Sequence, residues 1–339
     1  MTRRKFVRLA GSAIVAANLP LVIKVARLAA GEVLALPPFG GPTPNDRFYI
    51  TSYAATPRVD LAAWRLRIGG LVANPLELTW PDIKQLPAIE ETLTLECISN
   101  PPDGSLIGNA RWVGPKLRPL LERAQIKPGA VYAALHARDG YYTGVPVDEL
   151  MRRENFLPYL MNGAPLPPEH GFPLRLFIPG KYGMKQPKWI TEIRLLDRPF
   201  RGYWEMRGWS NAAWRKANSG FFAPRPIAGL SPDLAVATRV PAPVDVWGWA
   251  LAGPSGIRKV EVSTDDGRSW HAARLAGNRQ RYEWTVWKYH FAPRTAGLYH
   301  LRVRATAGDG TVQPVIDPQQ GAGMSGQPRL DLDLTPVEG

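Results

Sequence analysis

Apolar and polar residues alternate in short segments along much of this chain, with the period of two that is typical of half-buried strands. Trp64, Leu66 and Ile68, for example, alternate with two arginines. The pattern predicts further strands over residues 92–97, 131–136, 174–178 and 189–195. Three short helices are expected among them: one at Thr79-Trp80-Pro81-Asp82, which resembles a capping box with proline in the first turn, one from Pro115 to about Ala124, and one over residues 147–153.

The pattern becomes purely β after residue 228. An alternating run covers residues 244–250, and a second covers residues 299–305. Between them, Asp265-Asp266-Gly267 is a turn signal that follows Val260 and Val262. Several strands with such turns over roughly 100 residues predict an immunoglobulin-like sandwich that lacks the usual disulfide.

The order of these segments predicts the fold class and the domains. Short strands and helices mixed without a βαβα rhythm indicate an α+β fold rather than a doubly wound sheet. At 339 residues the chain exceeds the size at which a single core stops growing. We therefore expect a mixed α/β domain over residues 48–228 and an immunoglobulin-like β-sandwich domain over residues 229–335. Residues 36–47 are rich in proline and glycine and predict a linker, and residues 201–228, with three tryptophans, predict another that packs against its surroundings.

The first 35 residues have features of an export signal. Thr2-Arg3-Arg4-Lys5-Phe6-Val7-Arg8 has the twin-arginine form, and a modest apolar stretch follows from Leu9 to Ile23. That stretch is too short to span a membrane comfortably and suits the apolar region of a signal. We therefore expect export to the periplasm by the twin-arginine route. An uncleaved N-terminal membrane anchor and a basic, fraying terminus are the alternatives.

Composition restricts the class of protein. Apolar residues make up 45% of the chain and charged residues 21%, which fits a folded protein rather than a disordered one. The single cysteine excludes intramolecular disulfides, four-thiolate zinc sites and protein-bound iron–sulfur clusters. The net charge of +13 indicates first a solvated basic surface, and second a site for an anionic cofactor or substrate. Without a dense basic run, zinc-finger spacing or an RNP-type segment, nucleic acid is not expected as a partner.

The lone cysteine, Cys97, ends an apolar strand and precedes a Pro-Pro-Asp-Gly loop. A free cysteine on its own is usually a small buried hydrophobe. Residues at strand ends that lead into loops, however, are often displayed at functional sites, and a thiolate suits a soft or high-valent metal. One thiolate does not hold a metal by itself, so the other donors would come from a cofactor.

A second group of candidate residues lies between Glu169 and Trp189. This segment holds one histidine, one arginine, three lysines and three glycines. Arginine offers phosphate a planar fork of donors, lysine offers a point charge, and glycine permits close backbone approach. The segment predicts an anion-binding loop, with a solvated basic loop as the alternative.

Other motifs give little support to other chemistry. His136, His271, His290 and His300 have no metal-ligand spacing and are expected to be structural. The chain has no HExxH, GxSxG, GxGxxG or GxxxxGK[ST] motif, so neither a zinc protease, a nucleophile elbow nor a nucleotide-binding loop is indicated.

Taken together, these segments resemble the sulfite oxidase family of molybdopterin enzymes over about residues 45–335. In the first domain the motifs that carry the resemblance, in order, are Glu96-Cys97, Ala110-Arg111-Trp112 with Gly114 and Pro115, Leu160-Met161-Asn162-Gly163, Pro165-Leu166-Pro167, His170-Gly171-Phe172-Pro173-Leu174-Arg175, Gly183 and Lys188-Trp189. In the second domain, which resembles the family's dimerisation sandwich, they are Val260-Glu261-Val262-Ser263, Asp266-Gly267, Ser269-Trp270, Trp287 and Val312-Gln313-Pro314.

The resemblance implies a molybdenum–molybdopterin cofactor bound by residues 48–228. It implies that Cys97 is the protein thiolate on molybdenum and that a pterin dithiolene supplies two more sulfurs. The implied chemistry is two-electron oxygen-atom transfer, in which the cofactor does the bond chemistry and the protein supplies positioning and electrostatics. Insertion of such a cofactor in the cytoplasm is a reason for export in the folded state. The implied cofactor contacts are Tyr49, Thr51, Ser52, Tyr53, Asp139, His170, Arg175, Gln186 and Lys188.

Departures from the family pattern bear on the substrate. Sulfite-oxidising members surround their anionic substrate with arginines, but this chain has Thr51, Pro101-Pro102 and a segment near Gly256 at the matching places. These departures argue against sulfite as the substrate and make a less charged or neutral molecule, such as a sulfoxide or an N-oxide, an equal candidate. Trp112 matches the family's pocket tryptophan, and Trp209 stands where those members have a pocket tyrosine. Both are expected catalytic residues beside Cys97.

Partners follow from the same comparison. The chain has no CxxCH haem motif, so we expect no haem in it and expect an external electron-transfer protein, such as a cytochrome. A homodimer is expected by analogy with the family's dimerisation domain. Two other functions stay open: a non-catalytic envelope protein that binds a partner through its Trp-rich segment, and a hydrolase with an unrecognised triad.

Overall fold

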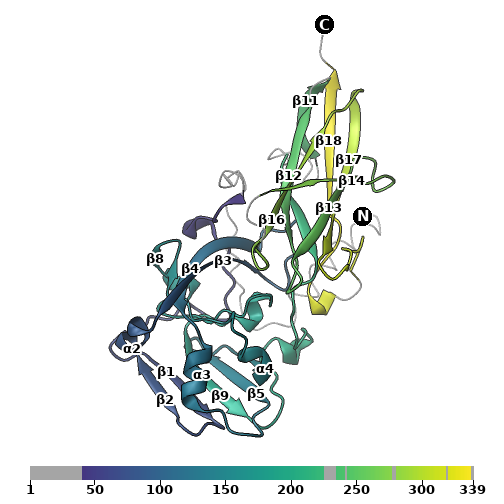
Figure 1. The fold of residues 1–339 in the computed structure, drawn as a ribbon. Coiled ribbons are helices and arrows are strands. Elements are labelled where there is room, and N and C mark those ends of the chain that lie inside the picture. The colour runs from purple at the N-terminus through teal and green to yellow at the C-terminus, as the bar shows by residue number, and fades with distance from the viewer. Residues whose placement is uncertain (1–39, 225–233, 241–242, 277–279, 318–319, 337–339) are drawn as a thin grey trace, which may run out of the picture.

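The computed structural model describes residues 40–224, 234–240, 243–276, 280–317 and 320–336. The predicted export signal over residues 1–35 lies outside these ranges. Within them the chain is rich in strands and forms two bodies, a mixed α/β domain and a β-sandwich (Figure 1). The expected α+β class, with the sandwich second in the chain, is confirmed. None of the helices in the described ranges is long and apolar enough to cross a membrane.

The first domain contains two sheets. One has the strand order β2-β1-β9-β5-β6, in which β1 and β9 are parallel and the other neighbours are antiparallel. The other is an antiparallel sheet with the order β3-β4-β7-β8. The strands are β1 (Arg65–Gly70), β2 (Leu76–Thr79), β3 (Ala88–Glu96), β4 (Ile107–Pro115), β5 (Tyr132–Ala137), β6 (Tyr142–Pro146), β7 (Leu160–Met161), β8 (Ala164–Pro165) and β9 (Ile190–Leu196).

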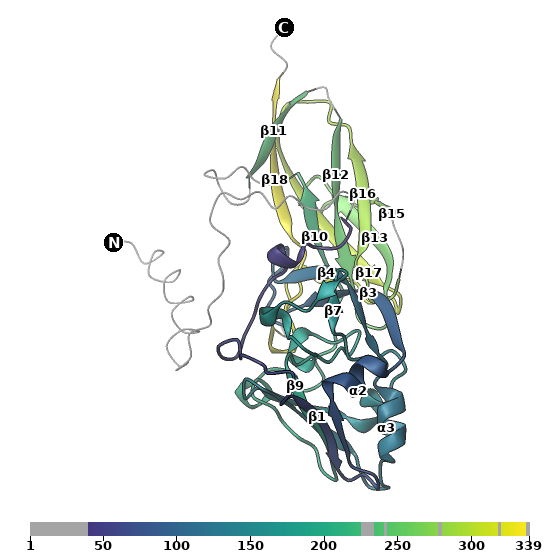
Figure 2. The same cartoon turned by 90° about the vertical axis from the view of Figure 1, so that its left-hand side faces the viewer.

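Three short helices pack beside the five-stranded sheet: α2 (Trp80–Gln85), α3 (Arg118–Ala124) and α4 (Val147–Leu150) (Figures 1 and 2). The predicted capping box is present, since the Thr79 hydroxyl accepts from the Asp82 N–H while the Asp82 carboxylate accepts from the Thr79 N–H. Alternate residues of the strands and the inner faces of the helices form one core; Leu66, Ile68, Leu120, Leu121 and Ile193 are among its members.

Two helix predictions need correction at their ends. Pro115 does not begin a helix but ends β4, so α3 starts only at Arg118. The helix predicted over residues 147–153 stops at Leu150. Before α3, Pro115 and Leu117 are buried outside the helix, whereas Arg152 and Arg153 after α4 are partly buried and exposed, so no apolar face extends the helix there.

Residues 174–178 are not a strand, contrary to the prediction. They cross the core as a buried loop, in which only Phe177 makes an isolated bridge, to Phe156. The backbone N–H groups of Arg175, Leu176 and Ile178 donate to acceptors in neighbouring loops instead of to a strand partner. Such an apolar run between prolines satisfies the strand pattern without forming a ladder, because periodicity does not separate the two states in short buried segments.

The sandwich consists of one sheet with the order β10-β12-β16-β15 and another with the order β11-β18-β17-β13-β14. The first of its strands, β10, lies inside the segment predicted as a linker, which corrects that prediction. Its strands are β10 (Asn218–Ala223), β11 (Leu234–Val240), β12 (Val244–Leu251), β13 (Ile257–Ser263), β14 (His271–Ala272), β15 (Arg274–Ala276), β16 (Thr285–Phe291), β17 (Gly297–Ala307) and β18 (Arg329–Pro336).

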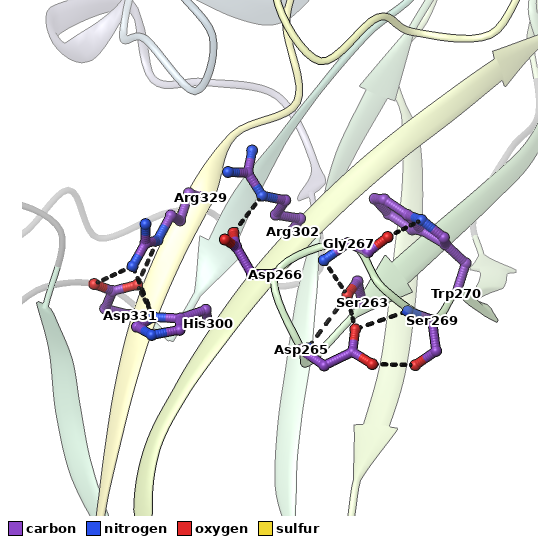
Figure 3. A network of polar contacts seen from close by, with 10 residues as sticks. All are labelled: Ser263, Asp265, Asp266, Gly267, Ser269, Trp270, His300, Arg302, Arg329 and Asp331. Atoms are coloured by element: carbon purple, nitrogen blue, oxygen red, sulfur yellow. Dashed lines mark hydrogen bonds and ion pairs between the residues drawn. The ribbon is translucent and has the colours of Figure 1, made fainter.

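The turn after β13 forms where Asp265-Asp266-Gly267 predicts it. Asp266 and Gly267 both have positive φ, of 60° and 89°. The Asp265 carboxylate accepts from the N–H of Ser269 at 2.9 Å and from its hydroxyl at 2.6 Å (Figure 3). Arg302 on β17 donates to the Asp266 carboxylate at 2.6 Å, which ties the turn to the neighbouring strand (Figure 3).

The antiparallel pair β3–β4 extends from the first domain to the sandwich (Figures 1 and 2). The Thr94 N–H donates to the Tyr282 carbonyl at 3.0 Å, and the Thr94 hydroxyl accepts from the Trp284 N–H at 2.8 Å. The end of β3, and with it Cys97, is therefore held between the two domains.

Candidate functional site

Cys97 directly follows β3 and is partly exposed. Its N–H donates to the Leu106 carbonyl at 2.9 Å, and its own carbonyl accepts from the Asn100 N–H at 3.0 Å. The thiol sulfur lies 3.3 Å from the Ser99 hydroxyl. The backbone is thus fixed on both sides of a cysteine that stays partly exposed, which is the arrangement of a displayed side chain rather than of a core cysteine.

The protein itself does not complete a metal site around this thiol. Within the ranges described above, no group of three or more His, Cys, Asp or Glu side chains lies together in a way that would hold a metal ion. A metal bound to Cys97 therefore needs further donors from a cofactor.

Tyr49 and Gly183 come from two other segments and lie near the end of β3, directly before Cys97. Gly183 begins a 3-10 turn (Gly183–Lys185), and a Cβ at this position would lie 3.4 Å from the Tyr49 hydroxyl and 3.6 Å from the Glu96 carbonyl oxygen. Burial raises the pKa of Tyr49 well above its usual value; the charge of Cys97 adds to this rise and Arg175 opposes it. Tyr49 is therefore a neutral phenol that interacts electrostatically with both Cys97 and Arg175.

Arg175 is the buried cation of that loop. Its side chain is 3% exposed and donates to two neutral acceptors, the carbonyls of His170 at 3.1 Å and Gln186 at 3.4 Å. Its Nε is buried and has no hydrogen-bond partner in the described part of the chain. Burial lowers the pKa of Arg175 to about 10. A buried guanidinium held only by carbonyls, with a donor to spare, is suited to an incoming anion.

Lys188 lies next to Arg175 and shares this property. Its ammonium donates to the Ser52 hydroxyl at 3.0 Å and to the Glu169 carbonyl at 2.8 Å. Burial lowers the pKa of Lys188 to about 7, and the charge of Arg175 contributes to the shift. Gly171, at φ 113°, lets the two cations share the loop, since a Cβ there would lie 3.1 Å from the Lys188 Cβ and 3.2 Å from the Arg175 Cβ.

His170 and Asp139 complete this cluster. The Nε2 of His170 lies 3.1 Å from the Asn45 carbonyl, which only accepts, so Nε2 carries the proton. Burial lowers the pKa of His170 to about 4, and the charge of Arg175 contributes, so the imidazole is neutral. Burial raises the pKa of Asp139, while Lys188 opposes that rise, and its carboxylate accepts from the Tyr141 N–H at 3.0 Å. We call Ser52, Asp139, His170, Arg175 and Lys188 the anion cradle.

The other two lysines of the segment are not available to a ligand. Lys181 lies 2.6 Å from the Glu149 carboxylate, and Lys185 is fully buried against the Glu205 carboxylate. The three lysines of the segment therefore have two roles. Lys181 and Lys185 fix the loop through their ion pairs, and Lys188 is part of the cradle.

The remaining predicted residues lie at different distances from this centre. Thr51 precedes Ser52 in the same partly buried segment, and Tyr53 packs edge-on against Tyr203 with ring centroids 4.6 Å apart. Gln186 contributes its carbonyl to Arg175, but its side-chain amide is used within the loop, by Ile178 N–H and Lys181 carbonyl.

The two predicted catalytic tryptophans differ in their placement. Trp209 is partly buried against the cluster that contains Ile98 and Met184, next to the thiol loop. Trp112 is fully buried, donates through its indole N–H to the Leu93 carbonyl at 3.1 Å and lies 5.3 Å from the Arg175 guanidinium carbon. The structure thus places Trp112 behind the cradle, where it supports Arg175, rather than at an open pocket.

Sequence reasoning did not assign a role to Glu96, Arg215 or Asn218. Glu96 is fully buried, and burial raises its pKa to about 7, although hydrogen bonds from Asn100 and Asn218 and the charge of Arg215 oppose the rise. Arg215 is also buried and donates to the Thr94 carbonyl. The only charged residue of the predicted strand 92–97, directly before Cys97, was the available signal for Glu96.

These features fit a phosphate-bearing pterin with a metal. The cradle offers an uncompensated buried guanidinium and an adjacent ammonium, the thiol is displayed without protein co-ligands, and glycines at the loop bends permit close approach.

Two family models match the chain. The model of the oxidoreductase molybdopterin binding domain matches residues 53–204, and the model of the Mo-co oxidoreductase dimerisation domain matches residues 227–320. Fold and site thus define a molybdopterin-dependent oxidoreductase.

The relatives agree with this class. The chain is 35% identical over 150 residues to the uncharacterized oxidoreductase YuiH of Bacillus subtilis, covering 44% of this chain and 74% of that protein. It is 26% identical over 319 residues to the sulfite oxidase of Gallus gallus, covering 80% and 68% of the two chains. The structure of the sulfane dehydrogenase SoxCD from Paracoccus pantotrophus has the same fold, with a TM-score of 0.75 and 24% identity. The match covers 87% of this chain and 82% of that chain. The chain belongs to the sulfite oxidase family of molybdopterin oxidoreductases.

Proposed function

We propose that this protein carries out two-electron oxygen-atom transfer on a small substrate, with a molybdenum–molybdopterin cofactor bound between Cys97 and the anion cradle. The observation that carries the proposal is the pairing of a displayed thiol without protein co-ligands with a buried, uncompensated Arg175. When bound, the cofactor supplies the metal centre at which an oxygen atom is exchanged, and Cys97 is its protein ligand.

The protein's own residues bind and orient the cofactor. Arg175 and Lys188 hold its phosphate, since both are cations whose hydrogen bonds go only to neutral acceptors. Neutral His170 offers its Nδ1 lone pair to an N–H donor of the pterin, because its Nε2 proton is used by Asn45. Tyr49 and Trp209 are the residues beside the thiol that face the substrate.

The substrate is less charged than sulfite. The buried guanidiniums beside the thiol are already engaged: Arg175 belongs to the cradle, and Arg215 acts on buried Glu96 and donates to the Thr94 carbonyl. Thr51 supplies no charge at the position where sulfite-oxidising members have arginine. A doubly charged anion would lose its hydration at such a site without compensation. A sulfoxide or an N-oxide fits better, in the balanced exchange XO + 2 e⁻ + 2 H⁺ ⇌ X + H₂O.

Electrons are exchanged with an external redox protein. The chain is exported by the twin-arginine route. It acts as a homodimer that pairs through the sandwich domain. The name of the matched dimerisation domain supports the homodimer. The Arg3-Arg4 motif supports export. Light scattering of the purified chain measures the oligomeric state, and a mass near that of one chain would contradict the dimer.

A substrate panel tests the proposal. The molybdenum-loaded chain is assayed with sulfite and a dye as acceptor, and with sulfoxides and N-oxides and a reduced dye as donor. We expect the neutral substrates to have a higher kcat/KM than sulfite. Thr51→Arg should raise kcat/KM for sulfite at least tenfold, whereas Thr56→Arg, an exposed position on the same segment, should not. Wild-type preference for sulfite would overturn the assignment of the substrate class.

A further inference from the structure

A chain of buried hydrogen bonds runs from the sandwich to the Cys97 loop. Gln313 Nε2 donates to Asn218 Oδ1 at 3.0 Å, Asn218 Nδ2 donates to Glu96 Oε1 at 3.0 Å, and Asn100 Nδ2 donates to the same oxygen at 3.1 Å. All four side chains are at most 1% exposed. Three of the four, all except Gln313, lie at or next to the junction of the two domains, because Asn218 begins β10 and Glu96 ends β3.

The direction of each bond is fixed by the groups at the two ends. The Ala305 N–H donates to Gln313 Oε1 at 3.0 Å, and the Leu106 N–H donates to Asn100 Oδ1 at 2.9 Å. A backbone N–H only donates, so each of these amides must turn its NH₂ group toward the centre of the chain. Two amide NH₂ groups, those of Asn218 and Asn100, therefore meet at the Glu96 carboxylate, and the network has one consistent arrangement.

The network ends on the backbone that holds the thiol. Asn100 donates through its N–H to the Cys97 carbonyl, and Leu106, which Asn100 binds, accepts from the Cys97 N–H. A second contact from the C-terminal part reaches the next residue, since the Met324 N–H donates to the Ile98 carbonyl at 3.2 Å. Both sides of Cys97 are thus anchored to groups outside the first domain's sheets.

We propose that Asn218 and Gln313 are positioning residues for Cys97, and that the sandwich domain fixes the thiolate loop in addition to any role in pairing chains. The inference deepens the proposed function, because it rests on Cys97 as the metal ligand. Satisfied polar networks inside a protein rigidify what they connect, and a site needs such support to hold its reacting groups in place. A change in the sandwich along this network is therefore transmitted to the thiol.

The rate of Cys97 alkylation tests this directly, because the chain has only one cysteine. Full-length protein without molybdenum is treated with iodoacetamide, and incorporation is followed by mass spectrometry. Asn218→Asp places a carboxylate against Glu96 and removes a donor, and we expect alkylation to be at least about tenfold faster than in wild type. Gln313→Glu should act in the same direction. Unchanged rates in both variants would overturn the proposal.

Two further variants separate positioning from general loss of stability. Leu332→Ala opens a cavity in the sandwich core away from the network and should leave the alkylation rate at the wild-type value at temperatures below unfolding. If it accelerates alkylation as much as Asn218→Asp does, the role is merely structural and the proposal fails. Leu334→Ala, in the same core, should behave like Leu332→Ala.

Molybdenum content distinguishes a failure of the proposed function from a failure of the positioning role. A wild-type chain that never binds molybdenum would refute the proposed function but leave the alkylation result interpretable. A wild type that binds molybdenum, together with an Asn218→Asp variant that binds it equally and alkylates at the wild-type rate, would refute only the positioning role.

Discussion

Arg175 and Arg215 are a matched pair of buried arginines that differ in what faces them. Arg175 donates only to carbonyls, whereas Arg215 lies in the field of the buried Glu96 carboxylate. Replacing each with methionine removes one buried guanidinium and keeps an apolar stem of similar length. Arg215→Met should therefore lose more stability than Arg175→Met, and Arg175→Met should lose more cofactor binding.

The magnitudes follow from burial and hydrogen bonds. Burial lowers the pKa of Arg175 to about 10, which corresponds to about 3 kcal/mol of cost for its charge. Arg175→Met removes that cost and also loses two bonds from a charged donor, worth roughly 1.5 kcal/mol each. The free energy of unfolding of the cofactor-free variant should thus stay within about 2 kcal/mol of wild type. Arg215→Met loses a charged bond to the Thr94 carbonyl and the charge that opposes the rise in the pKa of Glu96, and should lose about 2–3 kcal/mol.

Cofactor binding should be weakened more by Arg175→Met than by Arg215→Met. Loss of a charge-assisted bond to a phosphate weakens binding by roughly 1.5–3 kcal/mol, or at least about tenfold. Urea unfolding of the cofactor-free chains and molybdenum per chain at limiting cofactor supply measure the two effects. Arg175→Met with wild-type molybdenum content, or with a loss of stability equal to that of Arg215→Met, would refute the assignment of the cradle.

Two further predictions concern the lysines. Burial lowers the pKa of Lys188 to about 7, so between pH 7 and 10 the unfolded chain binds a proton that the folded chain has lost, and stability should rise by up to about 1.4 kcal/mol per pH unit. Urea unfolding across this range should show that contribution disappear in Lys188→Met and persist in Lys127→Met, an exposed position; equal slopes in both variants would contradict it. Lys185→Met and Glu205→Gln should each cost about 3–5 kcal/mol because each leaves a buried charge unpaired, while Lys185→Met/Glu205→Leu should cost clearly less; single variants within 1 kcal/mol of wild type would disprove this pairing.

Sequence patterns predicted the architecture well where burial has a simple period. The alternation at Trp64, Leu66 and Ile68 corresponds to β1, and the capping box at Thr79 begins α2. The prediction was wrong at residues 174–178, which are buried on all sides and whose backbone bonds go to loops. In a segment where every residue is buried, Arg175 included, the apolar pattern carries no information on which side of the chain faces the core.

The candidate site was predictable as a set of residue types but not as a set of roles. Spacing alone did not separate Lys188 from Lys181 and Lys185, because their partners Glu149 and Glu205 come from distant segments. For the same reason the link from Gln313 through Asn218 to Glu96 was not visible, since it joins residues about 95 and 122 positions apart in the chain. Such pairings depend on tertiary structure, not on local pattern.

The central claim is that Cys97 is a ligand of molybdenum. X-ray absorption at the molybdenum edge of the loaded chain measures the number of sulfur neighbours of the metal. We expect three sulfur neighbours of molybdenum in wild type, two from the pterin and one from Cys97. We expect two in Cys97→Ser. The same sulfur count in both proteins, or no molybdenum in the wild-type chain under full cofactor supply, would contradict it.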